Sequence, residues 1–440
     1  MRSLQNQGFN RRSFLKLAGG ATVALASASV LPRLAGRLLE PAESTTAQDL
    51  PPDLRLAGTD GWIYLPPSPA IPPYHPDNLA PPPFTTYIFG FRNVTGLTEQ
   101  QVFAQKMKAQ HAAPMFWVNE GSEFRLQLTN LGLAVRPDLV DAHTVHWHGF
   151  RNAIPFFDGE PHGSLSVNIG KSFTYIYRPV DPGTYMYHCH VEDVEHVHMG
   201  MTGLVWVNPA QNGNTALYPS GKFAYNDGDG STGFDREFGM LLTEVWTVSH
   251  WSDAHIQLPE WSDYHPEFFL LNGRTYPDTI APNGAWTDPA NPTGTDANGD
   301  LLPTAGYERL QYQPISSLVR ANSGERVLLR FANLGFKAAS LVLPGIKMKV
   351  VGEDAGLLRG RDGTDQSYET NLISLGPGES ADVIFTAPPY QGPGPYDRYF
   401  LYNRAYGSAN NLEASGLAGQ ATEVWVYPPG ALPPQTLPNT

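Results

Sequence analysis

Short strand-like runs of apolar and aromatic residues, separated by turn-forming residues, recur along the chain from about residue 86. Runs of this length and composition, bounded by turn signals, predict β-strands. The clearest runs cover residues 87–91, 115–118, 124–128, 173–177, 203–207, 238–242, 327–331, 381–385 and 423–426. Many short strands at this spacing predict an all-β chain built of sandwiches or barrels.

The strand runs fall into two groups, which predicts two domains in tandem. The predicted segments are an arm over residues 46–85, a first domain over 86–209, a linker over 210–236, a second domain over 237–428 and a tail over 429–440. The arm is expected to run extended over the surface, because its many prolines exclude it from central strands. Residues 281–306 are predicted to be an irregular insertion in the second domain.

An internal repeat relates the two predicted domains. The sequence Asn119-Glu120-Gly121, followed by Thr129-Asn130-Leu131-Gly132, recurs as Asn322-Ser323-Gly324 and Ala332-Asn333-Leu334-Gly335. The number of residues between the two glycines is the same in both copies. Such self-similarity indicates that one β-fold is used twice.

The N-terminus and the charge balance bear on location and partners. Residues 1–45 contain Arg11-Arg12 followed by an apolar run, Leu17–Leu31, which is typical of a twin-arginine signal. That signal predicts export of the folded protein to the periplasm, cell wall or medium of a bacterium. No other stretch is long and apolar enough to predict membrane insertion. The net charge of −13 argues against nucleic acid as a partner.

The only cysteine, Cys189, stands directly between His188 and His190, and four more soft or borderline donors follow it. These are His196, His198, Met199 and Met201. A thiolate, imidazoles and a thioether are ligands that copper prefers, and two histidines, one cysteine and a weak axial methionine form a blue-copper site. This segment therefore predicts copper binding.

A second histidine segment lies upstream, with His143, His146 and His148 in the sequence HTVHWHG. In a strand His146 and His148 would share one face while His143 lies on the other, so one segment can serve two sites. The two segments together hold seven of the 13 histidines, a concentration that favours metal binding over ordinary core packing.

The pattern H-x-x-H-x-H-G at residues 143–149, with H-C-H, a later histidine and Gly-Met at residues 188–201, resembles the multicopper oxidases. It is most similar to the two-domain, laccase-like members whose blue copper lies in the first domain. The resemblance implies two cupredoxin-like Greek-key β-domains, each a sandwich or barrel. It also implies copper as the cofactor and a homotrimeric assembly.

The resemblance assigns two sites. The type 1 copper would be held by His143, Cys189, His196 and Met201, with His198 and Met199 as alternatives to the last two. Half of a type 2/type 3 site would be formed by His146, His148, His188 and His190. Electrons from a small reducing substrate or a redox protein would enter at type 1 copper and pass through Cys189 to the second site, where dioxygen is reduced.

The sequence departs from the family in its second domain. The family's trinuclear cluster uses eight histidines, and this chain has none beyond His265. The remaining candidates, His162, His250 and His255 among them, are expected to be ordinary loop or strand-end residues, and His75 and His111 to lie at the surface. Two alternatives follow: a blue-copper electron carrier with an incomplete second site, and a nitrite reductase-like enzyme.

The nitrite reductase alternative is the weaker of the two. That family is expected to carry an aspartate at the position of His146, a residue other than histidine at the position of His190, and a histidine in the second domain. This sequence meets none of these expectations.

Overall fold

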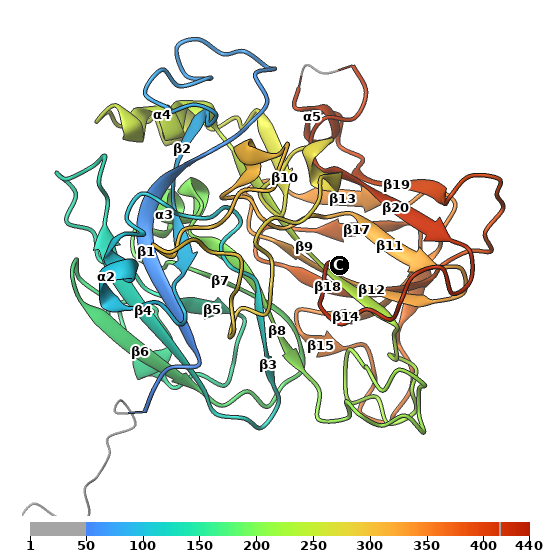
Figure 1. Ribbon diagram of the computed structural model, residues 1–440. Coiled ribbons are helices and arrows are strands. Elements are labelled where there is room, and N and C mark those ends of the chain that lie inside the picture. The colour runs from blue at the N-terminus through green and yellow to red at the C-terminus, as the bar shows by residue number, and fades with distance from the viewer. Residues whose placement is uncertain (1–49, 413–414) are drawn as a thin grey trace, which may run out of the picture. The chain divides into compact units, whose positions relative to one another are not determined.

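Four β-sheets contain the strands of this computed structural model, which describes residues 50–412 and 415–440 (Figure 1). The predicted signal segment, residues 1–45, lies outside the described residues. All nine strand runs predicted from the sequence are strands in the structure. The all-β prediction is therefore confirmed.

The first half of the chain forms two four-stranded sheets, in the orders β2-β1-β4-β6 and β3-β8-β7-β5. Their strands are β1 (Leu54–Ile63), β2 (Thr86–Asn93), β3 (Phe116–Asn119), β4 (Phe124–Gly132), β5 (His146–His148), β6 (Ser172–Tyr177), β7 (Gly183–His188) and β8 (Thr202–Asn208). The two sheets enclose one apolar core, to which Leu56, Phe116 and Val205 contribute.

The second half forms a seven-stranded sheet, β10-β9-β12-β18-β14-β15 with β16 also paired to β14, and a five-stranded sheet, β11-β20-β19-β13-β17. The strands of the larger sheet are β9 (Arg236–Val245), β10 (Phe268–Leu271), β12 (Arg326–Asn333), β14 (Met348–Glu353), β15 (Gly356–Leu357), β16 (Tyr368–Thr370) and β18 (Ser380–Thr386). Those of the smaller sheet are β11 (Val319–Asn322), β13 (Ala339–Val342), β17 (Leu372–Leu375), β19 (Asp397–Asn403) and β20 (Ala421–Tyr427). A second core fills the space between them.

Helices are short and lie between strands. They are α2 (Glu99–Phe103), α3 (Asp193–Met199), α4 (Thr247–Ala254) and α5 (Tyr406–Asn410), with 3-10 turns at Pro155–Phe157, Trp261–Asp263, Asp278–Ile280 and Glu308–Leu310. Within the described residues, no helix is long and apolar enough to cross a membrane. The predicted linker and insertion carry no named strand.

The two halves repeat one topology. In the first half β1 pairs with β2 antiparallel and with β4 parallel, and in the second half β9 pairs with β10 and β12 in the same senses. Likewise β3 runs parallel to β8, as β11 does to β20. The repeated asparagine has the same role in both copies, because Asn130 Oδ1 accepts from the amide of Gly132 and Asn333 Oδ1 from that of Gly335. The predicted repeat is confirmed.

One predicted boundary is wrong. The segment 46–85 was expected to be an extended arm, but its residues Leu54–Ile63 form β1, which lies between β2 and β4 inside a sheet. The prolines of this segment lie before the strand, at Pro51 and Pro52, and after it, from Pro66 onward, so none of them interrupts the pairing. The glycines and single polar residues of the strand interrupt the apolar run by which the other strands are recognised.

The two halves share a buried contact. An apolar cluster joins Met186, Leu204 and Trp206 of the first half to Leu241 and Ala332 of the second. Beside it lies a polar cluster centred on Arg330 and Asp382, both about 1% exposed or less.

Hydrogen bonds and ion pairs link this polar cluster across the two halves. Asp382 accepts from Thr184 Oγ1 at 2.5 Å and from the Tyr225 hydroxyl at 2.6 Å. Arg330 Nη1 lies 3.3 Å from Asp382 Oδ1, and its Nε lies 3.0 Å from Glu237. A buried cation costs several kcal/mol unless paired, so each partner is needed for the others to remain buried.

We therefore expect Asp382→Ala to lower the free energy of unfolding by about 3 kcal/mol, because it leaves Arg330 buried with one carboxylate instead of two. Glu369→Ala is the matched control: Glu369 pairs with Lys347 where both side chains are more than half exposed, and its removal should cost less than about 1 kcal/mol. Denaturant unfolding of both variants measures the difference. Equal losses would contradict a structural role for the buried cluster.

Candidate metal centre

The loop between β7 and β8 carries the cysteine segment and contains α3. Asp193 and Glu195 lie in the first turn of α3, where negative charge stabilises a helix N-terminus, and Gly200 ends the helix with a φ of 120° that favours glycine. The loop closes on itself, because the amide of Cys189 donates to Met201 O at 3.2 Å and the amide of Met201 donates to His196 O at 2.9 Å. The helical turn thus returns the chain to Cys189.

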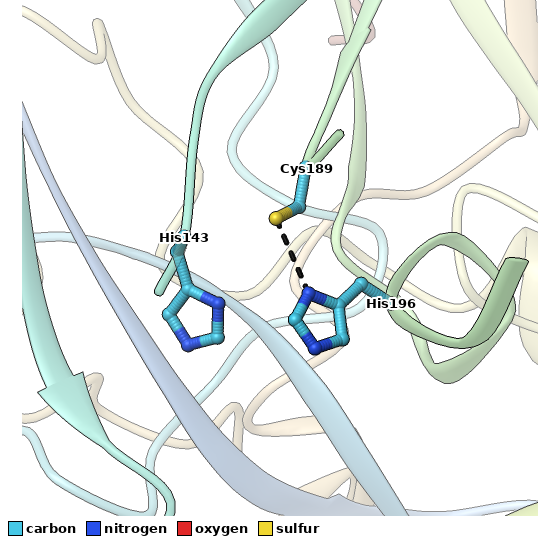
Figure 2. A group of neighbouring side chains, drawn as sticks. All are labelled: His143, Cys189 and His196. Atoms are coloured by element: carbon cyan, nitrogen blue, oxygen red, sulfur yellow. Dashed lines mark hydrogen bonds between the residues drawn. The ribbon is translucent and has the colours of Figure 1, made fainter. Parts of the chain in front are cut away.

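Three predicted ligands converge at this loop (Figure 2). The ligand atoms of His143, Cys189 and His196 all lie within 4.8 Å of one another, and His196 Nδ1 lies 3.3 Å from Cys189 Sγ. None of the three side chains is exposed. Neither ring nitrogen of His143 has a hydrogen-bond partner, which is costly for a buried imidazole and is what a metal ligand would leave free.

Met201 lies at the same place, next to His143. A Cβ on Gly58 of β1 would stand 2.8 Å from His143 Cδ2 and 3.4 Å from Met201 Cε, so both side chains press against the glycine. Met201 is also fully buried. Gly58 therefore makes room for the histidine and the methionine, and a side chain at this position would displace His143.

The two alternative donors point elsewhere. His198 Nε2 accepts from the amide of Trp246 at 3.1 Å, and Met199 Sδ lies 3.9 Å from Ser249 Oγ. Trp246 and Ser249 belong to the start of α4 in the second half. His196, rather than His198, lies toward Cys189, and Met201, rather than Met199, lies beside His143 against Gly58.

The electrostatics of the group favour a thiolate. Burial opposes ionisation of Cys189, but the neighbouring His196 and His143 outweigh burial and hold the pKa of the thiol well below its usual range. Burial likewise disfavours charge on His196, yet Cys189 and Asp141 raise the pKa of its imidazole. The amide of Thr144 also points at Cys189 Sγ, at 3.4 Å. A soft anionic sulfur with two imidazoles is a donor set that fits copper.

A second group forms on β5 and β7, which pair so that His146 faces His188. Ligand atoms of His146, His148 and His188 lie within 4.8 Å of one another. His146 Nδ1 donates to Asp158 O and His188 Nδ1 to Cys189 O, both at 2.9 Å, so the Nε2 atoms of both rings are directed away from these carbonyls, and that of His188 lies 3.4 Å from His148 Nδ1. Backbone carbonyls commonly orient metal-binding imidazoles in this way. His190 lies beside this group, with its ring 5.0 Å from that of His146.

These imidazoles are held neutral. Burial lowers the pKa of His188 to about 3, and it also lowers the pKa values of His146 and His148. A metal binds the neutral imidazole, so no proton has to be displaced from these residues near neutral pH.

The surroundings of the second group do not fit an eight-histidine cluster. The second half of the chain contributes Leu334, Gly335, Phe336, Pro377 and Gly378 to a pocket of about 260 Å³ against His148, His188 and His190. None of these five side chains can bind a metal. The residues fit a cysteine-containing copper site and a histidine group, and they do not fit the family's complete cluster.

The other histidines have partners of their own. His162 is exposed beside Glu160, His255 pairs with Asp77 and stacks on Trp251, and His265 is exposed beside Glu267.

Two surface predictions are wrong, for His75 and His111, each of which is 1% exposed. His75 Nε2 lies 2.8 Å from Pro66 O and its ring packs on Phe268. His111 lies behind α3, with Nε2 3.2 Å from Thr243 Oγ1. His250 is equally buried, within α4 rather than in a loop.

Sequence comparison agrees with the site. The multicopper oxidase family profile matches residues 93–212, which include every residue of both groups. Laccase-5 of Arabidopsis thaliana is 25% identical over 302 residues, 68% of this chain, and an L-ascorbate oxidase of Nicotiana tabacum is 28% identical over 248 residues, 55% of this chain. Both groups therefore lie in a segment that matches the multicopper oxidase family. Copper is accordingly the metal that the family implies here.

The similarity covers less than half of the length of these two relatives, and it extends to the fold of a solved structure. The chain spans 41% of the length of the laccase and 36% of that of the ascorbate oxidase. A blue copper oxidase from Nitrosomonas europaea has a similar fold, with a TM-score of 0.53 over 84% of this chain and 85% of the other at 19% identity. The cupredoxin-like fold in tandem is confirmed.

Sequence reasoning missed three residues that shape the site. Asp141 Oδ2 lies 3.5 Å from His196 Nε2, Thr144 contacts Cys189 and accepts from the amide of His190 at 2.9 Å, and Gly58 makes room for His143. Asp141 and Thr144 flank His143 in the sequence, so proximity to a predicted ligand is the signal that could have found them. No feature of the local sequence indicates that Gly58 has this role.

The buried histidines behind α3 predict a loss of stability in acid. Burial lowers the pKa values of His111 and His250 to about 4 from 6.5. Between pH 6.5 and about 4 the unfolded chain takes up these protons and the folded chain does not. The contribution of these histidines to the free energy of unfolding is therefore fully present above pH 6.5. It falls as the pH approaches about 4, by up to roughly 3 kcal/mol per histidine. Denaturant unfolding at about pH 7.5 and pH 5 of the wild type and of His250→Gln measures this. The variant should lose less stability on acidification, and parallel losses would contradict the assignment.

Proposed function

We propose that this chain is a laccase-like copper oxidoreductase, which takes single electrons from a small reducing substrate or a redox protein and passes them to dioxygen. The observation that carries the proposal is the meeting of His143, Cys189, His196 and Met201 in one dry site, joined through Cys189 to a second histidine group. Similarity to laccases and to an ascorbate oxidase supports it. Bound copper would supply one-electron redox chemistry.

The residues of the first site are suited to hold copper with little rearrangement. His143, Cys189, His196 and Met201 would be its ligands. Their burial excludes water, and the amide of Thr144 directed at Cys189 Sγ stabilises negative charge on sulfur. Hydrogen bonding and hydrophobicity around the cysteine sulfur set the potential of such sites.

Cys189 also provides the connection to the second group. Its backbone leads directly into His188, and His188 Nδ1 donates to Cys189 O at 2.9 Å. Copper held by Cys189 Sγ would supply the one-electron chemistry, and the Cys189 backbone would provide a short covalent and hydrogen-bonded path to the imidazoles of β5 and β7.

Electrons would enter beside His196. Its Nε2 faces Asp141, and the exposed Glu192 completes a group whose ligand atoms lie within 4.8 Å of one another. These two carboxylates place negative charge where the buried site comes close to the surface. Together with the net charge of −13, they favour neutral or cationic reductants over anionic ones.

We also propose export by the twin-arginine route and assembly as a homotrimer. Arg11-Arg12 and the apolar run after it support export, and the resemblance to two-domain relatives supports the trimer. Replacing both arginines by lysine should retain the protein in the cytoplasm.

Sedimentation should give three times the mass of the chain, and a monomer mass would contradict the assembly.

The copper-loaded protein should show the intense visible band of thiolate-to-copper charge transfer and should consume dioxygen as it oxidises a phenolic reductant. Cys189→Ser removes the soft ligand, so it should abolish the band and reduce oxidation to background. His162→Ala, which removes an exposed histidine outside both groups, should change neither. A wild type that lacks the band, or a serine variant that keeps it, would refute the proposal.

A further inference from the structure

We propose that His146, His148 and His188 bind a single copper ion, so that the second centre is a mononuclear site completed within this chain rather than half of a shared cluster. The inference rests on the proposed function and deepens it, because it specifies the metal content of the second site. It follows from the geometry of the three histidines and from what surrounds them.

The three imidazoles already converge on one point. Their ligand atoms lie within 4.8 Å of one another, and His148 Nδ1 is 3.4 Å from His188 Nε2. Carbonyl groups fix the rings of His146 and His188 through Nδ1. Three oriented imidazoles form a complete donor set for one ion with an open position, and copper is the divalent first-row metal that such nitrogen ligands bind most tightly.

His190 stands apart from this convergence. Its ring lies 5.0 Å from that of His146 and 5.5 Å from that of His188, yet its nitrogens are not among the ligand atoms that meet. Instead it lines the pocket beside His148 and His188. The geometry selects three of the four histidines.

The facing wall offers no further imidazole. Gly378, in the loop between β17 and β18, would place a Cβ only 3.0 Å from His148 Nε2, and its φ of +81° also favours glycine. Leu334 and Phe336, in the loop between β12 and β13, supply apolar surface to the same pocket. On this side the second half of the chain covers the histidines with glycine backbone and apolar side chains, while Asp354 and Ser380 line a separate pocket beside His148.

A neighbouring copy could not complete a cluster either. Four more imidazoles would be required, and among the described residues outside the two groups only His162 and His265 have mostly exposed side chains, at 95% and 67%. His75, His111, His198 and His250 are buried, and the His255 side chain is only 20% exposed and stacks on Trp251. A second copy thus offers at most two histidines where four are needed.

Copper analysis of the full-length protein, loaded with excess copper and freed of unbound metal, tests the proposal together with electron paramagnetic resonance. We expect two copper ions per chain, both paramagnetic when oxidised, one with the visible band and one without. Four ions per chain with a paramagnetically silent pair would overturn the proposal. A single ion per chain would overturn it as well.

Two variants separate ligands from neighbours. His146→Gln should lose the second copper and keep the visible band, which also shows that the variant is folded. His190→Gln should retain both coppers, because the His190 side chain is not a ligand. The backbone amide at residue 190 still donates to Thr144 Oγ1 in this variant. Loss of copper from His190→Gln, with the visible band intact, would contradict a three-histidine site.

Failure of this inference can be told from failure of the proposed function. If the visible band and dioxygen-coupled oxidation are present but four coppers are found, only the inference fails. If the visible band is absent from the copper-loaded wild type, the proposed function fails first.

Discussion

Strand geometry at Cys189 is the constraint on which the site depends. In an extended segment successive side chains point to opposite faces, so a cysteine between two histidines directs its sulfur to one side and the imidazoles to the other. Here Cys189 Sγ meets His143 and His196, while His188 joins His146 and His148. The same alternation in the upstream segment sends His143 to the sulfur side. Two centres are thus placed a single residue apart in the chain, and neither can move without the other.

The second half of the chain contributes by packing rather than by ligands. The amide at the start of α4 donates to His198 and so fixes the face of α3 opposite His196. Thr243 of β9 contacts His111, which lies against the end of α3 at Gly200. The loops of the second half that line the pocket beside His148 and His188, β12–β13 and β17–β18, contribute glycine, proline and apolar side chains and no ligand to that pocket. The second copy of the repeat has the same strand framework as the first, and its contacts hold the first half in place.

Much of the fold and the site could be predicted from the sequence because the signals are local. Strand-like runs of four or five residues between turn signals predicted nine strands, and the spacing of histidines around Cys189 predicted both groups. The rest depends on contacts between distant residues. Strand β1 is recognised only through its pairing with β2 and β4, since its own pattern is interrupted by glycine. The burial of His75 and His111 requires partners more than a hundred residues away, which no local window contains.

The apolar cluster between the halves bears on how such a chain can be divided. Met186, Leu204 and Trp206 project from the strands that position the ligands, and they are covered by Leu241 and Ala332 of the second half. Removal of the second half would expose this face to water and leave Thr184 without Asp382. Two copies of one fold have therefore become mutually dependent. Although the repeat is modular in sequence, the two halves should unfold in one cooperative transition. The copper-binding half should therefore not fold without the second half.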